Sequence, residues 1–259
     1  MVQKLLLAGL MTLAVNANAQ STSDAAYFTI SKAQVRELSK DEAENAVAVS
    51  QSMKSLTFAN TVEVPSLANV VGSVAGSNSG LGGLAAVGAE VDEANIVLDK
   101  IINLGKKVWD LVQEGKPVVN IKTDVATALP QGVRGVADLQ NWQVPKYKVY
   151  DISYKNAYGI TVVDLQYRVL FLSGGSVNGK GQYVGYASVE PLNVDVLWGF
   201  KLNVEASVPT VYFTGTKDNP VAALYLQIKW SVDPILGLQH QEQTQTYMVS
   251  GDGSFRTLQ

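Results

Sequence analysis

Residues 192–208 alternate apolar and polar side chains with a period of two. The apolar positions are Leu192, Val194, Val196, Trp198, Phe200, Leu202, Val204, Ala206 and Val208. Such a period places these side chains on one face of a β-strand. At about 3.3 Å per residue, the run exceeds the usual length of a strand. We therefore expect a bend near Gly199, which would let the two halves of the run serve two sheets.

The same alternation recurs across residues 117–259 and predicts antiparallel strands with one solvated face. One further strand has the inward positions Leu224, Leu226, Ile228, Trp230 and Val232. The sequence SGGSVNGKG at 173–181 is typical of a hairpin turn, because glycine tolerates positive φ. These signals predict the α+β class: a mainly antiparallel β-sandwich C-terminal domain at 117–259, preceded by an α-helical N-terminal region. A small barrel is the alternative architecture for the strands.

Two helices are predicted before the β domain. Ser39 and Glu42 form a capping-box pattern at the start of the first helix. The second is predicted over residues 91–116, where apolar residues recur every three or four positions. We expect this amphipathic helix to dock on the β domain. A membrane or partner-helix role is the alternative.

The first residues have the pattern of a secretory signal. Lys4 precedes an apolar run at 5–15, and Ala17 and Ala19 are the small residues that a signal peptidase reads. We expect residues 1–19 to be a signal peptide of the general secretory pathway. The mature protein would then be periplasmic, on the cell surface or secreted.

An uncharged stretch rich in Gly, Ala and Ser occupies residues 66–90. Each glycine costs a helix about 1 kcal/mol relative to alanine, so a continuous helix is disfavoured there. We expect a linker between a helical region at 20–65 and the helix at 91–116. A close-packed segment of small residues and a membrane-inserting segment are the alternatives.

Charge and cysteine content narrow the function classes. The net charge is −3 and no cluster of Lys and Arg is present, so the sequence lacks the electrostatic footprint of a nucleic-acid binder. The chain contains no cysteine, which excludes disulfides, thiol catalysis and cysteine-based metal sites. The core alone must therefore hold the fold together.

No recognisable catalytic motif is present. His240 is the only histidine, and neither a zinc-ligand set nor a G-x-S-x-G motif accompanies it. Carboxylates of the β region are Asp151, Asp164, Glu190, Asp195, Glu205, Asp218, Asp233 and Glu242. Two of them would suffice for glycoside hydrolysis, but alternation places most of them on solvated faces. We expect no catalytic residue, no cofactor and no metal; a carboxylate-only hydrolase is the alternative.

The tyrosines of the β region suggest a binding surface. Tyr183 and Tyr186 lie near the glycine turn, where we expect them to be exposed. The predicted function is that of an exported, non-catalytic β-sandwich protein. It would bind a protein partner, a glycan or a membrane surface, in the cell envelope or outside the cell.

The alternative is a membrane-acting, pore-forming-like protein. It would use the Gly-rich stretch and a helix at 91–114. The apolar face of that helix would contain Val97, Ile101, Val108 and Trp109.

Overall fold

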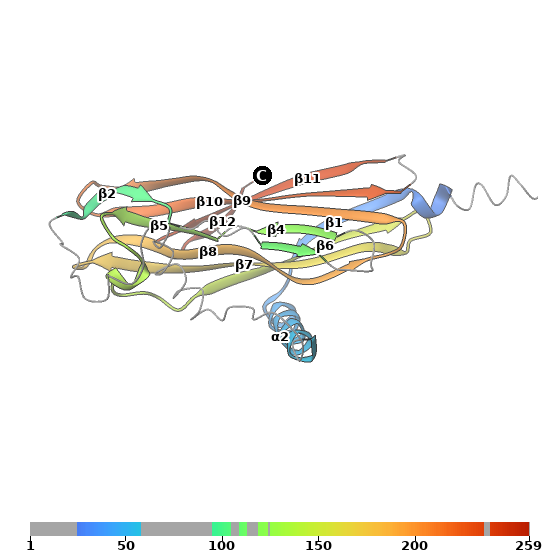
Figure 1. The fold of residues 1–259 in the computed structure, drawn as a ribbon, viewed down its shortest axis with the longest axis horizontal. Helices are drawn as coiled ribbons and strands as arrows, with labels where there is room; N and C mark the ends of the chain where they lie inside the picture. The colour runs from blue at the N-terminus through green and yellow to red at the C-terminus, as the bar shows by residue number, and fades with distance from the viewer. Residues whose placement is uncertain are drawn as a thin grey trace, which may run out of the picture.

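The computed structural model describes residues 25–57, 95–104, 109–112, 119–123, 125–235 and 239–258. Within these ranges the protein is mainly β. Twelve strands form one sheet, which curls around the long axis of an elongated molecule (Figure 1). The predicted signal peptide at 1–19 and the predicted linker at 66–90 lie outside the described residues.

The long strands belong to the C-terminal part of the chain, and the short ones come before them. In chain order the elements are β1 (Ile30–Glu37), α2 (Lys40–Thr57), β2 (Val97–Ile102), β3 (Trp109–Val112), β4 (Val119–Thr123), β5 (Val125–Gln131), η2 (Val136–Asp138), β6 (Lys146–Asn156), β7 (Thr161–Val177), β8 (Lys180–Val196), β9 (Phe200–Gly215), β10 (Pro220–Pro234), β11 (Gln241–Ser250) and β12 (Phe255–Leu258).

The sheet is built mostly from antiparallel neighbours. Its main path is β1-β6-β7-β8-β10-β9-β4-β3, with β11 and β12 continuing from β10, and β5 and β2 from β8. Strands β8 and β10 are joined by one parallel pair, Val221 with Gln182, so the path turns sharply there. The curl brings the inner faces of β6 and β7 against those of β10 and β11. One contact across this core is the hydrogen bond from Trp230 Nε1 to the Tyr154 hydroxyl at 2.9 Å.

The bend expected near Gly199 is confirmed. Strand β8 ends at Val196 and pairs with β7 and β5, whereas β9 begins at Phe200 and pairs with β10 and β4. Gly199 has φ +88°, and a Cβ atom there would collide with the ring of Phe28. Both facts require glycine at this turn. Trp198, however, leaves the inward face at the bend and is 71% exposed, so its predicted inward position is wrong.

The predicted hairpin turn is also confirmed, between β7 and β8. Asn178 has φ 50° and Gly179 has φ 75°, while Val177 and Lys180 pair on either side. Two central residues with positive φ define the type I′ turn, whose twist matches that of the flanking strands.

The helix predicted to begin after Ser39 is present as α2. It packs on the outer face of the sheet (below the strands in Figure 1), where Leu38 and Ala43 meet Val149 of β6. Of the residues before it, only 25–28 form a helical turn; residues 30–37 form β1, which pairs along β6. Among the described residues the other edge of β1 has no partner strand, and seven of its eight residues are exposed. The N-terminal region therefore contributes a strand to the sheet.

The amphipathic helix predicted over 91–116 is wrong. Residues 97–102 form β2, which pairs with β5, and residues 109–112 form β3, which pairs with β4. The β-branched residues of this segment favour strands, and pairing with the sheet decides their conformation. In the described parts of the chain, no helix is both long and apolar enough to cross a bilayer.

Candidate functional site

The two tyrosines predicted to form a binding surface are buried. Tyr183 is 0% exposed and Tyr186 is 2% exposed. The Tyr183 hydroxyl donates to the carbonyl oxygen of Leu98 at 3.0 Å, and burial, with the nearby Asp99 charge, raises its pKa to about 12. Neither side chain is available to a partner, so this prediction is wrong. Strand β8 is covered on both faces here, which alternation alone does not reveal.

The predicted helix face is not assembled either. Val97 and Ile101 lie on β2 and are partly buried, and Ile101 packs against the main core. Trp109 lies in β3, while Val108 is outside the described residues. The three described positions lie on two different strands, so they do not form one helical face.

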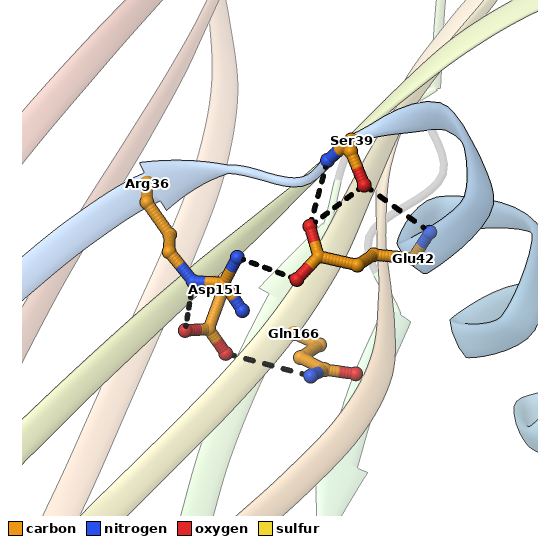
Figure 2. A network of polar contacts seen from close by, with 5 residues as sticks. All are labelled: Arg36, Ser39, Glu42, Asp151 and Gln166. Carbon is orange, nitrogen blue, oxygen red and sulfur yellow. Dashed lines mark hydrogen bonds and ion pairs between the residues drawn. The ribbon is translucent and has the colours of Figure 1, made fainter.

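A polar network on the outer face of the sheet holds the start of α2 (Figure 2). Glu42 accepts hydrogen bonds from the backbone N–H and the hydroxyl of Ser39, both at 2.9 Å, which completes the predicted capping box. Arg36 of β1 donates to Glu42 at 2.9 Å and reaches Asp151 of β6 at 3.4 Å. Gln166 of β7 donates to the other oxygen of Asp151 at 3.4 Å. Both Asp151 oxygens are thus engaged in joining strands.

Asp164 lies beside this network, and the pKa of its carboxyl group is raised well above its ordinary value. Burial, then the negative charges of Asp151 and of its cross-strand neighbour Asp195, raises its pKa to about 6. Among the described residues its Oδ1 atom is buried without a hydrogen-bond partner. The cause is the register of the sheet, which places Asp195 of β8 directly opposite Asp164 and Asp151 of β6 diagonally across from it.

A second carboxylate, Glu190, is fully engaged. Arg168 contacts one oxygen of Glu190 through two nitrogens, at 2.7 and 2.6 Å. The hydroxyls of Tyr186 and Ser188 donate to the other oxygen at 2.7 and 2.9 Å. Burial raises the pKa of Glu190, but the Arg168 charge and these hydrogen bonds outweigh it and hold the pKa below its usual value. The arrangement is a structural clamp between β7 and β8.

His240 lies in an exposed charge cluster near the start of β11. Its Nδ1 contacts Asp233 and its Nε2 lies 3.7 Å from Glu242, which also binds Lys229 at 2.8 Å. The hydrogen bond and charge of Asp233 raise the pKa of His240 above its ordinary value. Across the described ranges, no group of three or more His, Asp or Glu side chains is placed to hold a metal ion.

One interior cavity, between the two halves of the sheet, is too small for an organic ligand. It has a volume of about 10 Å³ and is lined by apolar side chains that include Ile121, Leu165 and Ile228. This is about the volume that a single water molecule needs.

The most unusual surface lies at one end of the molecule, where several loops expose large apolar side chains. We define the apolar tip as Tyr158 (53% exposed), Ile160 (47%), Leu197 (39%), Trp198 (71%) and Ile235 (64%). They come from the β6–β7 turn, the β8–β9 turn and the end of β10. Contiguous exposed apolar surface is rare on monomeric proteins and marks interaction sites.

Hydrogen bonds between loops bring the tip together. Leu197 N donates to Val162 O at 2.8 Å, which ties the β8–β9 turn to the start of β7. Ile235 N donates to Gly199 O at 2.8 Å, which ties the same turn to the end of β10. These bonds therefore bring three segments that are distant in sequence side by side at this end of the molecule.

Aromatic packing supports the tip from behind. The helical turn at residues 25–28 lies at this end of the molecule (right in Figure 1). The Tyr27 hydroxyl donates to Trp198 O at 3.0 Å, and the Phe28 ring lies 6.1 Å from that of Trp198 and 6.0 Å from that of Phe200. These contacts hold the turn in place while the indole of Trp198 stays in solvent.

Strand alternation missed Trp198 because it assigned this residue to the inward row. A Trp followed directly by the glycine of an expected bend is the signal that was available in the sequence. A bend interrupts the two-residue period, so a side chain within it need not follow the row.

No protein-family model, no curated protein and no solved structure matches this chain.

Proposed function

We propose that this chain is an exported, non-catalytic protein that binds a partner or a surface in the cell envelope or outside the cell, and that the apolar tip makes the contact. The observation that carries the proposal is the 71% exposure of Trp198 on a turn braced by Tyr27 and Phe28. Exposing an indole in water is unfavourable, so a rigid support that keeps it exposed favours a role in binding.

The surroundings of two acidic side chains, Asp151 and Glu190, support a non-catalytic role. Asp151 is saturated by Arg36 and Gln166, and Glu190 by Arg168, Tyr186 and Ser188. Carboxylates that are already neutralised by such partners are poor general acids or nucleophiles. Export rests on the signal pattern of residues 1–19.

We further propose that the curled sheet is best described as a β-sandwich. One layer would contain β1, β6, β7, β8 and β5, and the other β4, β9, β10, β11 and β12. The division is supported by the single parallel pair between β8 and β10, and by the shift of the chain at Gly199 from the first group of strands to the second.

The membrane-acting alternative, in the form that uses a helix at 91–114, has lost its support. Within that segment, residues 97–102 and 109–112 are strands, and no described residue is in an α-helix. A binding role for the tip needs neither this helix nor the Gly-rich stretch.

A retention experiment tests the proposal. The protein, purified after export, is incubated with peptidoglycan sacculi, with envelope polysaccharide and with lipid vesicles, and each material is sedimented. We expect retention on at least one of the three. The double variant Trp198→Ser/Ile235→Ser should lose it by about tenfold or more, since both apolar anchors are removed.

Val144→Ser is the matched control. Val144 is 83% exposed but precedes β6, outside the tip loops, so retention should be unchanged. The proposal is overturned if the wild-type protein is retained on none of the three materials, or if the tip variant is retained as well as the wild type.

A further inference from the structure

We infer that the apolar tip seats in the interface of a lipid bilayer, with Trp198 as its deepest anchor. This inference rests on the proposed function, because it names the class of surface that the tip binds. It is argued from the composition, shape, charge and support of the tip.

The composition of the tip fits lipid better than sugar. Three of its five members, Ile160, Leu197 and Ile235, are aliphatic, and the other two are Tyr and Trp. A glycan site needs polar groups aimed at the sugar hydroxyls beside the aromatic rings, and branched aliphatic side chains supply none. Trp and Tyr are the residues that favour the boundary between headgroups and acyl chains, whereas Leu and Ile favour the apolar side of it.

The position of the tip also fits a bilayer. Its members are carried by turns and strand ends at one extremity of the elongated molecule (Figure 1). A bilayer accepts such an end without a preformed complementary shape. A protein partner would need a hollow that matches several separate loops.

Charged residues begin immediately behind the tip. Asp195 and Lys201 flank the β8–β9 turn, and Asp233, whose Cα pairs in register with Lys201, lies two residues before Ile235. Lys155 lies at the base of the β6–β7 turn, opposite Thr161. At about 3.3 Å per residue, a separation of one to three residues places this charged collar roughly 3–10 Å behind the tip. Interfacial segments bury their apolar face by about 5–10 Å, so the collar would meet the headgroups.

The charge of the collar predicts which lipids bind. It combines two lysines with two aspartates; Lys32 of β1 pairs in register with Lys155, and His240 contacts Asp233. No charged residue occurs in the turns themselves at 157–160 and 197–199. Strong attraction to anionic lipid requires a cluster of several Lys and Arg residues, and the collar has no such cluster. Binding should therefore be driven by apolar contact and be nearly the same on zwitterionic and anionic vesicles.

The tip is preorganised for this contact. The hydrogen bonds of Leu197 and Ile235, and the support of Trp198 by Tyr27 and Phe28, fix the loops before any partner arrives. Docking then orders few additional side chains, which lowers the entropic cost of binding.

Vesicle flotation tests the inference. The protein is mixed with phosphatidylcholine vesicles, with and without phosphatidylserine, at low salt and in 1 M salt, and floated on a density gradient. We expect co-flotation with phosphatidylcholine alone, a change of less than about twofold on adding phosphatidylserine, and no loss in high salt. Trp198→Ser/Ile235→Ser should reduce co-flotation by about tenfold or more, whereas Val144→Ser should not. Unchanged denaturation midpoints would show that both variants remain folded.

Depth is measured by tryptophan quenching with lipids brominated near the headgroup. Quenching should appear with the wild type and disappear in Trp198→Phe, which keeps an aromatic anchor and should still float. The inference is overturned if phosphatidylcholine vesicles do not float the protein, if binding requires anionic lipid or is lost in salt, or if quenching persists in Trp198→Phe. Tip-dependent retention on sacculi or polysaccharide without flotation would overturn the lipid assignment and leave the proposed function standing.

Discussion

Trp230 and Trp198 both belong to runs of alternating apolar residues, yet the structure treats them in opposite ways. Trp230 is 2% exposed, and its indole donates to the buried hydroxyl of Tyr154. Trp198 is 71% exposed; Tyr27 donates to its backbone carbonyl, and the Phe28 ring lies 6.1 Å from its indole. The comparison teaches that alternation identifies core residues only while the strand remains regular. At a bend, a large aromatic residue that continues the inward row can instead be exposed at the surface.

The largest effect is expected at the buried member of this pair. Trp230→Ala should lower the free energy of unfolding by about 3–5 kcal/mol, because it opens a cavity in the core and leaves the Tyr154 hydroxyl unpaired. Urea denaturation, followed by far-UV circular dichroism, measures the change. A loss below about 1 kcal/mol would contradict the assignment of Trp230 to the core.

A smaller loss is expected at the tyrosine pair in the same core. The hydroxyls of Tyr167 and Tyr247 lie 2.6 Å apart, and both residues are almost fully buried. Tyr167→Phe should cost about 2 kcal/mol, because the Tyr247 hydroxyl loses its partner in an apolar setting. The double change Tyr167→Phe/Tyr247→Phe should recover part of this loss, since no orphaned hydroxyl remains. If the two single effects simply add, the pair is not coupled.

Asp164 lies between core and surface, and its effect on the stability of the fold should depend on pH. The pKa of its carboxyl group in the folded protein is about 6, above the ordinary value of 3.8. The folded state therefore favours the protonated carboxyl group. The resulting stabilisation of the folded protein is complete below pH 3.8 and is lost as the pH rises through 6. Asp164→Asn should therefore raise the free energy of unfolding by about 1–2 kcal/mol at pH 8, after allowance for solvent screening. The gain should nearly vanish at pH 4. An equal gain at both pH values would show that charge is not its cause.

The cap of α2 should have a more modest effect. Ser39→Ala removes the hydroxyl that bonds Glu42 and should cost about 1 kcal/mol at pH 7. The backbone N–H of Ser39 and the guanidinium of Arg36 lower the pKa of Glu42 to about 2, so the cap is intact above the ordinary pKa of 4.5 and is lost as the pH falls toward 2. Helical circular dichroism between pH 7 and pH 2 follows this loss. A signal that is flat over that range would contradict it.

The smallest effect on stability is expected at the tip. Trp198→Ala should change the free energy of unfolding by no more than about 0.5 kcal/mol, because the exposed indole contributes little to the core. The same urea titration used for Trp230→Ala gives a direct contrast. A loss comparable to that of Trp230→Ala would remove the distinction between a structural and a functional tryptophan.

Local sequence signals predicted local structure well. The capping box at Ser39 and Glu42, the hairpin turn at Asn178 and Gly179, and the bend at Gly199 depend on backbone conformation within a few residues. Each is present in the structure. The inward row from Leu224 to Val232 is buried for the same reason, since one regular strand carries it.

Predictions failed where distant segments decide the outcome. Residues 97–102 have apolar spacing that suits a helix, but pairing with β5 makes them a strand. Tyr186 was expected in solvent, yet it is covered by an outer apolar cluster that includes Val136 and Trp142 from the segment before β6. The apolar tip was missed for a similar reason, because its members come from separate turns that only the fold brings together.

The open-edged strand β1 has a consequence for how the chain acquires its structure. Glu37 of β1 forms an ion pair with Lys148 of β6, and the two residues are 111 positions apart in sequence. Strand β1 is made early, but it has nothing to pair with until β6 has followed it. Contacts of such long sequence separation slow folding, so completion of this side of the sheet should be a late kinetic event. Until β1 pairs with β6, the unpaired strand carries the charges of Lys32, Arg36 and Glu37. These charges oppose association between copies of the chain.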